Sequence, residues 1–190
     1  MNILGISGTP RKGGNSEHLL NAALEPFAEA GWDITKVLLS EKKIEPCIGC
    51  ETCMSSGLCH IDDDMAQVYA AYEKCDAIII SSPSYWRNVP AQLKALMDRT
   101  FAAAYAPSDH NPLRGKFGGA ISVGRGSCGG QSIVLGIIYN FYLSCGALGV
   151  AGELNGVSAV ADKPGDILSQ PRRLEQARVL GKNILKIAQL

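Results

Sequence analysis

The sequence predicts an α/β fold in which one open, five-stranded parallel sheet is covered by helices on both faces. Five short apolar runs alternate with five helical patterns, which is the element order that a parallel sheet requires. The first and third runs are apolar at consecutive positions, as in strands buried on both faces. Loops with polar and aromatic groups follow three of the runs, and two of these loops are rich in glycine. With 190 residues, 46% of them hydrophobic and 19% charged, the chain suits a single domain over residues 1–190 with a sizeable core.

The first third of the chain illustrates this alternation. A strand is expected at residues 2–7, followed by a polar loop at 7–16. A helix begins at about Ser16 and ends at Gly31, which is a suitable C-terminal cap. Its apolar face is formed by Leu19, Leu20, Ala23, Leu24 and Phe27. A second strand is expected at 33–39, so this region reads as a strand–helix–strand unit.

The rest of the chain continues in the same order. The later strands are expected at residues 77–81, 116–123 and 148–154, and the later helices at 65–72, 91–104, 133–145 and 171–188. Residues 105–115 carry Pro107 and Pro112 and are expected to form a loop. The aspartates at 62–64 are expected to cap the next helix. Residues 40–63 fit none of these elements, so we expect a cysteine-rich insertion after the second strand.

Charge and hydropathy exclude several partner classes. The 18 basic and 18 acidic residues balance to a formal net charge of zero, which provides no basic field for nucleic acid or anionic lipid. The N-terminal residues lack a positively charged leader, and no apolar run reaches the ~18 residues of a membrane span. We therefore expect a cytoplasmic protein that binds neither nucleic acid nor membrane. Its cysteines would lie in a reducing compartment, where metal or redox use is favoured over disulfides.

Four of the seven cysteines lie in one short segment with the spacing C-x2-C-x2-C-x5-C; they are Cys47, Cys50, Cys53 and Cys59. The repeated two-residue spacing is similar to the cluster-binding run of bacterial ferredoxins, whereas structural zinc usually takes two separated pairs. A 4Fe–4S cluster is therefore the first interpretation, a zinc site the second, and a loop of plain cysteines the third. His60 is expected to be an exposed loop histidine, with a role as donor to a cluster sulfur as the alternative.

The loop at residues 7–16 is predicted to bind a phosphate monoester. It combines the hydroxyls of Ser7, Thr9 and Ser16 with two cations and the free N–H groups of the following helix. The loop lacks both G-x4-G-K-[ST] and G-x-G-x-x-G, so it is neither a nucleoside-triphosphate loop nor the first turn of a dinucleotide fold. The alternative is a flexible polar turn.

Two further loops could enclose a flat heteroaromatic ring. The first carries Tyr85 and Trp86 beside Pro83 and Asn88, which places aromatic faces next to backbone donors and acceptors. The alternative is that both aromatic side chains cap the core. The second loop, at 124–129, matches G-x-G-x-x-G but follows the fourth strand, so we interpret it as a close backbone approach to the ring rather than an NAD site.

Taken together, these motifs make the chain similar to the flavodoxin-like NADPH-dependent FMN reductases and, within them, to the iron–sulfur flavoproteins. The resemblance covers most of the chain. It is carried by S-G-T-P-R-K-G-G-N-S at 7–16, P-C-I-G-C-E-T-C-M-S-S-G-L-C at 46–59, D-D-M at 63–65, S-S-P-S-Y-W at 81–86, P-A-Q-L-K-A-L-M-D-R at 90–99 and G-R-G-S-C-G-G-Q at 124–131.

The resemblance implies FMN and a 4Fe–4S cluster as cofactors, and it assigns residues to each. The FMN phosphate would be held by Ser7, Thr9, Pro10, Arg11, Asn15 and Ser16. The isoalloxazine and ribityl chain would contact Pro83, Ser84, Tyr85, Trp86 and Asn88, and the pyrimidine side would contact Gly124, Gly126 and Ser127. The cluster ligands would be Cys47, Cys50, Cys53 and Cys59.

The resemblance also implies an activity. The protein would be an FMN-dependent oxidoreductase that transfers electrons between a reduced donor, either NAD(P)H or a ferredoxin-type protein, and an acceptor. It would form a homo-oligomer, a dimer or a tetramer. No catalytic side chain is expected, because the cofactor carries the chemistry. Two alternatives stay open: a cluster-free NAD(P)H-dependent reductase of flavin, quinone, azo or nitro compounds, and a zinc-stabilised interaction module on the same scaffold.

Overall fold

The computed structural model describes residues 1–105 and 110–190, so Pro107 and part of the loop expected at 105–115 lie outside the described residues. The strands are β1 (Asn2–Ser7), β2 (Asp33–Leu38), β3 (Ala77–Pro83), β4 (Phe117–Gly124), β5 (Leu148–Gly149) and β6 (Val157–Val160). The α-helices are α1 (Asn15–Glu29), α2 (Thr52–Ser56), α3 (Met65–Lys74), α4 (Ala91–Arg99), α5 (Phe101–Ala104), α6 (Gln131–Ser144) and α7 (Pro171–Ala188). Two short 3-10 helices, η1 (Leu39–Glu41) and η2 (Asp166–Ser169), follow β2 and precede α7.

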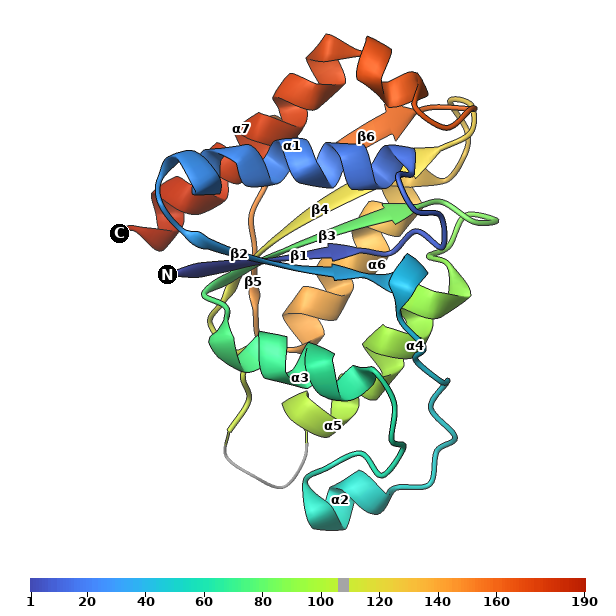
Figure 1. Cartoon of the computed structure of the whole chain (residues 1–190), viewed down its shortest axis with the longest axis vertical. Helices are drawn as coiled ribbons and strands as arrows, with labels where there is room; N and C mark the ends of the chain where they lie inside the picture. Colours follow the sequence, from blue (N-terminus) through green and yellow to red (C-terminus); the bar gives the residue numbers. More distant parts are fainter. Residues whose placement is uncertain (106–109) are drawn as a thin grey trace.

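The strands form one parallel sheet in the order β2-β1-β3-β4-β5, with β6 also paired to β4. The helices α1 and α7 cover one face, and α3, α4 and α6 cover the other (Figure 1). The predicted flavodoxin-like α/β fold with a parallel sheet and helices on both faces is therefore confirmed. All described helices are too short or too polar to cross a membrane.

The central strands are apolar throughout because they supply both layers of the core. In β3, Ile78 and Ile80 pack with α3, α4 and α6, while Ile79 between them packs with α1 and α7. Successive side chains of a strand point to opposite faces, so a strand covered on both sides needs apolar residues at every position. The same alternation divides Ile3 from Leu4 in β1. Each face of the sheet thus has its own hydrophobic core.

The strand expected at 148–154 is wrong in its bounds, and the sheet has six strands rather than five. In this part of the chain only β5 and, further along, β6 pair with β4, and the residues between β5 and β6 leave the ladder. Side chains satisfy its carbonyl groups instead: the Tyr139 hydroxyl donates to Val150 at 2.8 Å, and Asn183 Nδ2 donates to Ala151 at 2.9 Å. Alternative partners of this kind remove the need for a continuous ladder.

The helix expected at 91–104 is divided into α4 and α5 at Thr100. The Thr100 hydroxyl donates back to the carbonyl of Leu96 at 2.9 Å and lies 3.1 Å from the buried hydroxyl of Tyr72. A side chain that bonds to the preceding turn competes with the regular helical pattern and bends the helix. The division at Thr100 leaves Arg99 as the last residue of α4, buried beneath the cysteine-rich insertion.

Gly181 is the point where α7 lies against α1, and we expect Gly181→Ala to destabilise the protein. A methyl group there would overlap the carbonyl oxygen of Ala23 and lie 3.1 Å from its carbonyl carbon. Backbone cannot move aside cheaply, so the loss in unfolding free energy should be about 1–3 kcal/mol. Gly136→Ala in α6 is the matched control, because a methyl group there meets nothing within 4 Å.

The Gly136→Ala variant should gain about 1 kcal/mol from helix propensity. Urea unfolding of both variants measures the two effects. Equal stability changes at the two positions would contradict the close packing of α1 on α7.

Candidate functional site

A cavity of about 380 Å³ opens at the carboxyl end of the sheet. It is lined by Thr9, Arg11, Lys12, Gly13, Gly14, Asn15, Ser16, Pro83, Ser84, Tyr85, Val123, Gly124, Arg125, Ala161, Asp162, Lys163 and Pro164. These residues belong to the ends of β3 and β4, to the first turn of α1 and to the loops that follow β1, β3, β4 and β6. Ligands of open parallel sheets bind at this edge, so the cavity is the candidate functional site.

The structure brings together the three loops that the sequence singled out. The predicted residues that line the cavity are Thr9, Arg11, Asn15, Ser16, Pro83, Ser84, Tyr85 and Gly124. The predicted residues outside the lining are Ser7, Pro10, Trp86, Asn88, Gly126 and Ser127. Trp86 is fully exposed, so in this structure it neither caps the core nor faces the cavity.

The loop after β1 places two cations, Arg11 and Lys12, in the cavity lining, and one of them is in an ion pair. Lys12 pairs with Glu41 at 2.7 Å, at the start of the insertion. Arg11 lines the cavity and has no ion pair within the described ranges 1–105 and 110–190. The loop is folded on itself, because the Arg11 N–H donates to Thr9 Oγ1 at 3.2 Å. Arg11 is therefore the cation of this loop that is available to an anionic ligand.

The N-terminus of α1 supplies N–H donors beside Arg11. The first N–H groups bonded within the helix are those of Glu17 and His18, which both donate to the carbonyl of Gly14. Those of Asn15 and Ser16 precede this pattern and lie in the cavity wall. Helix N-termini attract anions through such N–H groups and the helix dipole. Together with the cation and the hydroxyl groups, this donor set fits a phosphate monoester.

Asn15 also holds a fourth loop at the cavity, a placement that the sequence did not predict. Its Nδ2 donates to the carbonyl of Lys163 at 2.7 Å, and its Oδ1 accepts from the N–H of Ile167 at 3.3 Å. A loop through Pro164 was expected, but its place at the cavity was missed because the last strand was expected to end at 154. The loop directly follows β6, and the short run Val-Ser-Ala-Val, with polar Ser158 between apolar residues, is the sequence signal that could have revealed this strand.

A tight turn extends the loop after β3. Tyr85 and Asn88 exchange backbone hydrogen bonds of 2.8 and 3.0 Å. The two residues between them, Trp86 and Arg87, have φ angles of 51° and 63°, a left-handed conformation that is uncommon for non-glycine residues. Gly130 makes room for this turn, because a methyl group there would lie 2.6 Å from Arg87 Cα. Such strain concentrates at binding sites, and here it borders the cavity.

The loops after β3 and β4 are bonded to each other. Ser84 donates through its N–H to the carbonyl of Val123 at 2.7 Å and through its hydroxyl to that of Gly129 at 2.5 Å. One wall of the cavity is therefore a connected unit. Ser7 lies below it at the end of β1, buried, and its hydroxyl has no hydrogen-bond partner among the described residues.

The cysteine-rich insertion projects from the sheet with α2 at its outer end (Figure 1). All four of its cysteines are free thiols; Cys47 and Cys50 are exposed, and Cys53 and Cys59 are half-buried. Burial and the neighbouring thiolates raise the pKa of Cys53, whereas hydrogen bonds from the side chain and backbone of Thr52 lower the pKa of Cys50. The thiols are thus near enough to influence one another.

The donor chemistry of the insertion fits an iron–sulfur cluster, which four thiolates can ligate. Within residues 1–105 and 110–190, no three cysteine, histidine or acidic side chains are arranged to hold a metal ion. The four thiols would have to draw together on binding. His60 is an exposed loop histidine, as expected, and its Nδ1 lies 3.3 Å from Cys50 Sγ.

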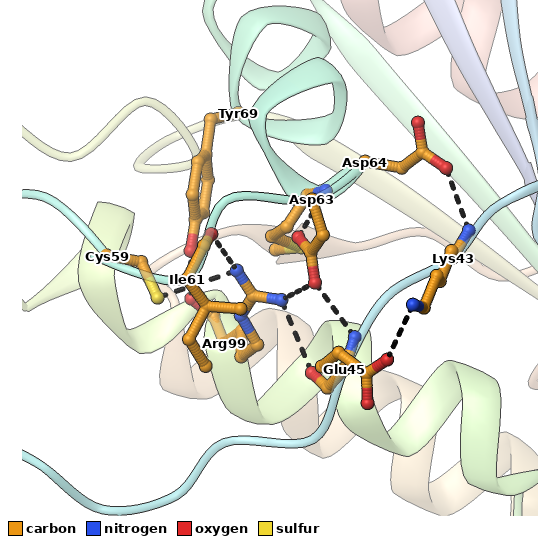
Figure 2. Close-up of polar contacts among 9 residues, drawn as sticks. Lys43, Glu45, Cys59, Ile61, Asp63, Asp64, Tyr69 and Arg99 are labelled. Atoms are coloured by element: carbon orange, nitrogen blue, oxygen red, sulfur yellow. Dashed lines mark hydrogen bonds and ion pairs between the residues drawn. The ribbon is translucent and has the colours of Figure 1, made fainter.

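Arg99 connects the insertion to the body of the protein, and the sequence did not predict this role (Figure 2). Its Nη1 pairs with the carboxylate of Asp63, and its Nη2 donates to the carbonyl of Ile61 at 3.1 Å and to Cys59 Sγ at 3.5 Å. Burial opposes the charge of Asp63, but the hydrogen bonds from Arg99 and from the N–H groups of Glu45 and Met65 outweigh it and lower the pKa of Asp63.

Of the aspartates expected to cap the next helix, Asp63 accepts from the first N–H of α3, whereas Asp64 does not act as a side-chain cap. Asp64 is the N-cap residue of α3 but makes no capping hydrogen bond with its side chain. Its carboxylate accepts from the N–H of Lys43 at 2.8 Å, and that of Asp63 accepts from Glu45 at 2.8 Å and from Met65 at 2.9 Å. These carboxylates mainly fasten the two ends of the insertion together.

The sequence matches one family of flavin reductases and relatives that are named iron-sulfur flavoproteins. Residues 1–159 match the family described as NADPH-dependent FMN reductase. An iron-sulfur flavoprotein of Methanocaldococcus jannaschii is 37% identical over 195 residues, covering 100% of this chain and 98% of its own. An iron-sulfur flavoprotein of Archaeoglobus fulgidus is 36% identical over 184 residues, covering 97% of this chain and 79% of its own.

Solved structures share the fold at lower sequence identity. The NAD(P)H:quinone oxidoreductase from Methanothermobacter marburgensis superposes with a TM-score of 0.73 at 20% identity, covering 97% of this chain and 96% of its own. A flavodoxin from the domain Archaea superposes with a TM-score of 0.64 at 14% identity, covering 100% of both chains. These likenesses support the flavodoxin-like fold described above.

Proposed function

The chain belongs to the family of NADPH-dependent FMN reductases and is an FMN-dependent oxidoreductase; on that premise, we propose that it transfers electrons between a reduced donor and an acceptor through FMN and a 4Fe–4S cluster. One observation carries the proposal: four free thiols lie in an insertion that Arg99 fastens to α4, the helix that follows the loop after β3. The same scaffold thus carries both the cavity proposed for the FMN phosphate and the thiols proposed as cluster ligands.

The cavity residues would hold and orient FMN. Thr9, Arg11, Ser16 and the N-terminus of α1 would bind its phosphate, and the wall formed by 83–85 with Gly124 would contact the ring. When bound, FMN supplies exchange between two-electron and one-electron chemistry, and a cluster supplies one-electron transfer. The protein would contribute the position of the cofactors and the groups that set their potentials, rather than a catalytic side chain.

The four cysteines of the insertion would ligate the cluster, and the physiological donor would be NAD(P)H or a ferredoxin-type protein. We further propose that the protein forms a homo-oligomer. The competing function is a cluster-free NAD(P)H-dependent reductase. One observation favours it: among the described residues, no three cysteine, histidine or acidic side chains are placed close enough to hold a metal ion.

Metal analysis and a visible spectrum of anaerobically prepared protein distinguish these functions. We expect bound FMN, iron and acid-labile sulfide, with reduction of both chromophores by NAD(P)H or reduced ferredoxin. FMN without iron would select the cluster-free reductase. Zinc without flavin would contradict both and select an interaction module.

Arg11→Ala should weaken FMN binding without affecting riboflavin, because Arg11 would contact only the phosphate. Loss of a hydrogen bond to a charged group costs about 1.5–3 kcal/mol, which is roughly a ten- to hundredfold rise in Kd. Fluorescence titration of the flavin-free protein with both flavins measures the difference. Arg172→Ala, on α7 outside the cavity lining, is the control. Equal weakening of riboflavin would contradict the placement of the phosphate at this loop.

A further inference from the structure

Arg99 is a buried cation in contact with one of the proposed cluster ligands. Its side chain is 1% exposed, and that of its partner Asp63 is 5% exposed. The guanidinium donates to the carboxylate of Asp63, to the carbonyls of Glu45 at 3.3 Å and Ile61 at 3.1 Å, and to Cys59 Sγ at 3.5 Å. All four partners belong to the insertion at 40–63. Glu45 lies before its cysteines and Ile61 and Asp63 lie after them, so Arg99 holds both ends of the insertion (Figure 2).

We propose that Arg99 is a positioning residue that holds Cys59 in place and makes the bound cluster easier to reduce. This inference rests on the proposed function, because it requires a cluster on the four cysteines. A hydrogen bond to a ligating sulfur and a nearby positive charge both stabilise the extra electron of the reduced state. Arg99 supplies both from a buried position, where water screens charge weakly.

The shape of the guanidinium is essential to this role. Its planar fork presents five N–H donors in fixed directions and can serve a carboxylate, two carbonyls and a sulfur at once. A lysine at the same position has the same charge, but its ammonium group is compact. It could pair with Asp63 without also reaching Cys59. The Nε–H of Arg99 is buried and has no acceptor among the described residues, so one donor of the fork is still available.

Asp63 opposes the effect of Arg99 on the cluster. Its carboxylate lies on the other side of the guanidinium from Cys59 (Figure 2), and its negative charge offsets part of the positive field at the sulfur. Removing the charge of Asp63 should therefore shift the cluster potential in the opposite direction from removing the Arg99–Cys59 hydrogen bond. A purely structural role predicts no such opposition, because both changes would loosen the same contact.

Reduction potentials measured in two variants test the proposed effect of Arg99 on the cluster. In the holoprotein, Arg99→Lys should lower the cluster reduction potential and Asp63→Asn should raise it, while the FMN potential in the same molecules stays unchanged. Potentials are read from an anaerobic titration followed by electron paramagnetic resonance and flavin absorbance. Arg172→Lys on α7 is the control and should change neither. Shifts in the same direction, or no shift in Arg99→Lys, would overturn the electrostatic part of the proposal.

Hydrogen exchange of metal-free protein tests the positioning part without a cluster. Amides at residues 57–63 should exchange faster in Arg99→Lys than in the wild type, because the bonds to Ile61 and Cys59 are lost. Unchanged exchange would overturn the positioning role. If wild-type protein binds no iron, the proposed function and the effect on potential both fail, whereas the exchange result still decides whether Arg99 holds Cys59.

Discussion

A Cys53→Ser variant is expected to lose essentially all its iron and to bind FMN as the wild type does. Cys53 lies in α2, half-buried, with the other thiolates of the insertion near enough to raise its pKa. A serine hydroxyl is a much poorer ligand than a thiolate for an iron–sulfur cluster. The cavity lining contains none of the cysteines, so the flavin site should be unaffected.

Iron content and the Kd for FMN, measured on the same anaerobic preparation, check this expectation. Cys128→Ser is the matched control: it removes an exposed thiol outside the insertion and should retain iron. Iron that persists in Cys53→Ser would exclude that thiol as a ligand. Loss of both iron and FMN would show that the two sites depend on each other.

Breaking the Arg99–Asp63 pair should cause the largest loss of stability among the single substitutions considered. In Arg99→Met, the carboxylate of Asp63 remains buried without its cation, and this typically costs about 3–5 kcal/mol. Asp98→Asn is the control, because it removes a surface pair with Lys94 whose side chains are 55% and 44% exposed. Such exposed pairs contribute less than about 1 kcal/mol. Urea unfolding of metal-free protein at pH 7 measures both changes.

The same pair predicts a dependence of stability on pH. Because the pKa of Asp63 is lowered in the folded state, its stabilising contribution is complete above the ordinary aspartate pKa of about 3.9 and is lost as the pH falls through the lower folded value. Asp63→Asn cannot titrate, so its unfolding free energy should fall less than that of the wild type between pH 5 and pH 2. An identical acid dependence in both proteins would contradict the lowered pKa.

Much of the fold could be predicted from the sequence, because its information is local. A run such as Ile78–Ile80 is apolar at each position only if both faces of the strand are covered, and the helix that begins near Ser16 shows its buried face directly. The composition of the segments after β1, β3 and β4, with glycine in the first and last and proline and hydroxyl groups in the second, predicted loops at one edge of the sheet, and these loops do meet at the cavity. That they bind FMN, and that the cysteines bind a cluster, stays a prediction.

The misses concern interactions between distant residues. The break between β5 and β6 depends on Tyr139 and Asn183, and the loop at 161–164 reaches the cavity through Asn15. Neither contact leaves a pattern within a window of neighbouring residues. The exposure of Trp86 was not foreseen for a related reason: a tight turn with positive φ values turns it outward, and the sequence showed only that an aromatic residue was present.

The sequence by itself determined the layered α/β architecture and the chemical groups available at its edge, because periodic burial and loop composition are local properties. Only the tertiary structure decided how those groups are used. In the sequence, Arg99 is an ordinary cation at the end of a predicted helix. In the structure it is buried against Asp63 and Cys59, which are 36 and 40 residues away in the chain. A buried charge must find partners wherever the fold brings them, and here those partners are the insertion that carries the thiols.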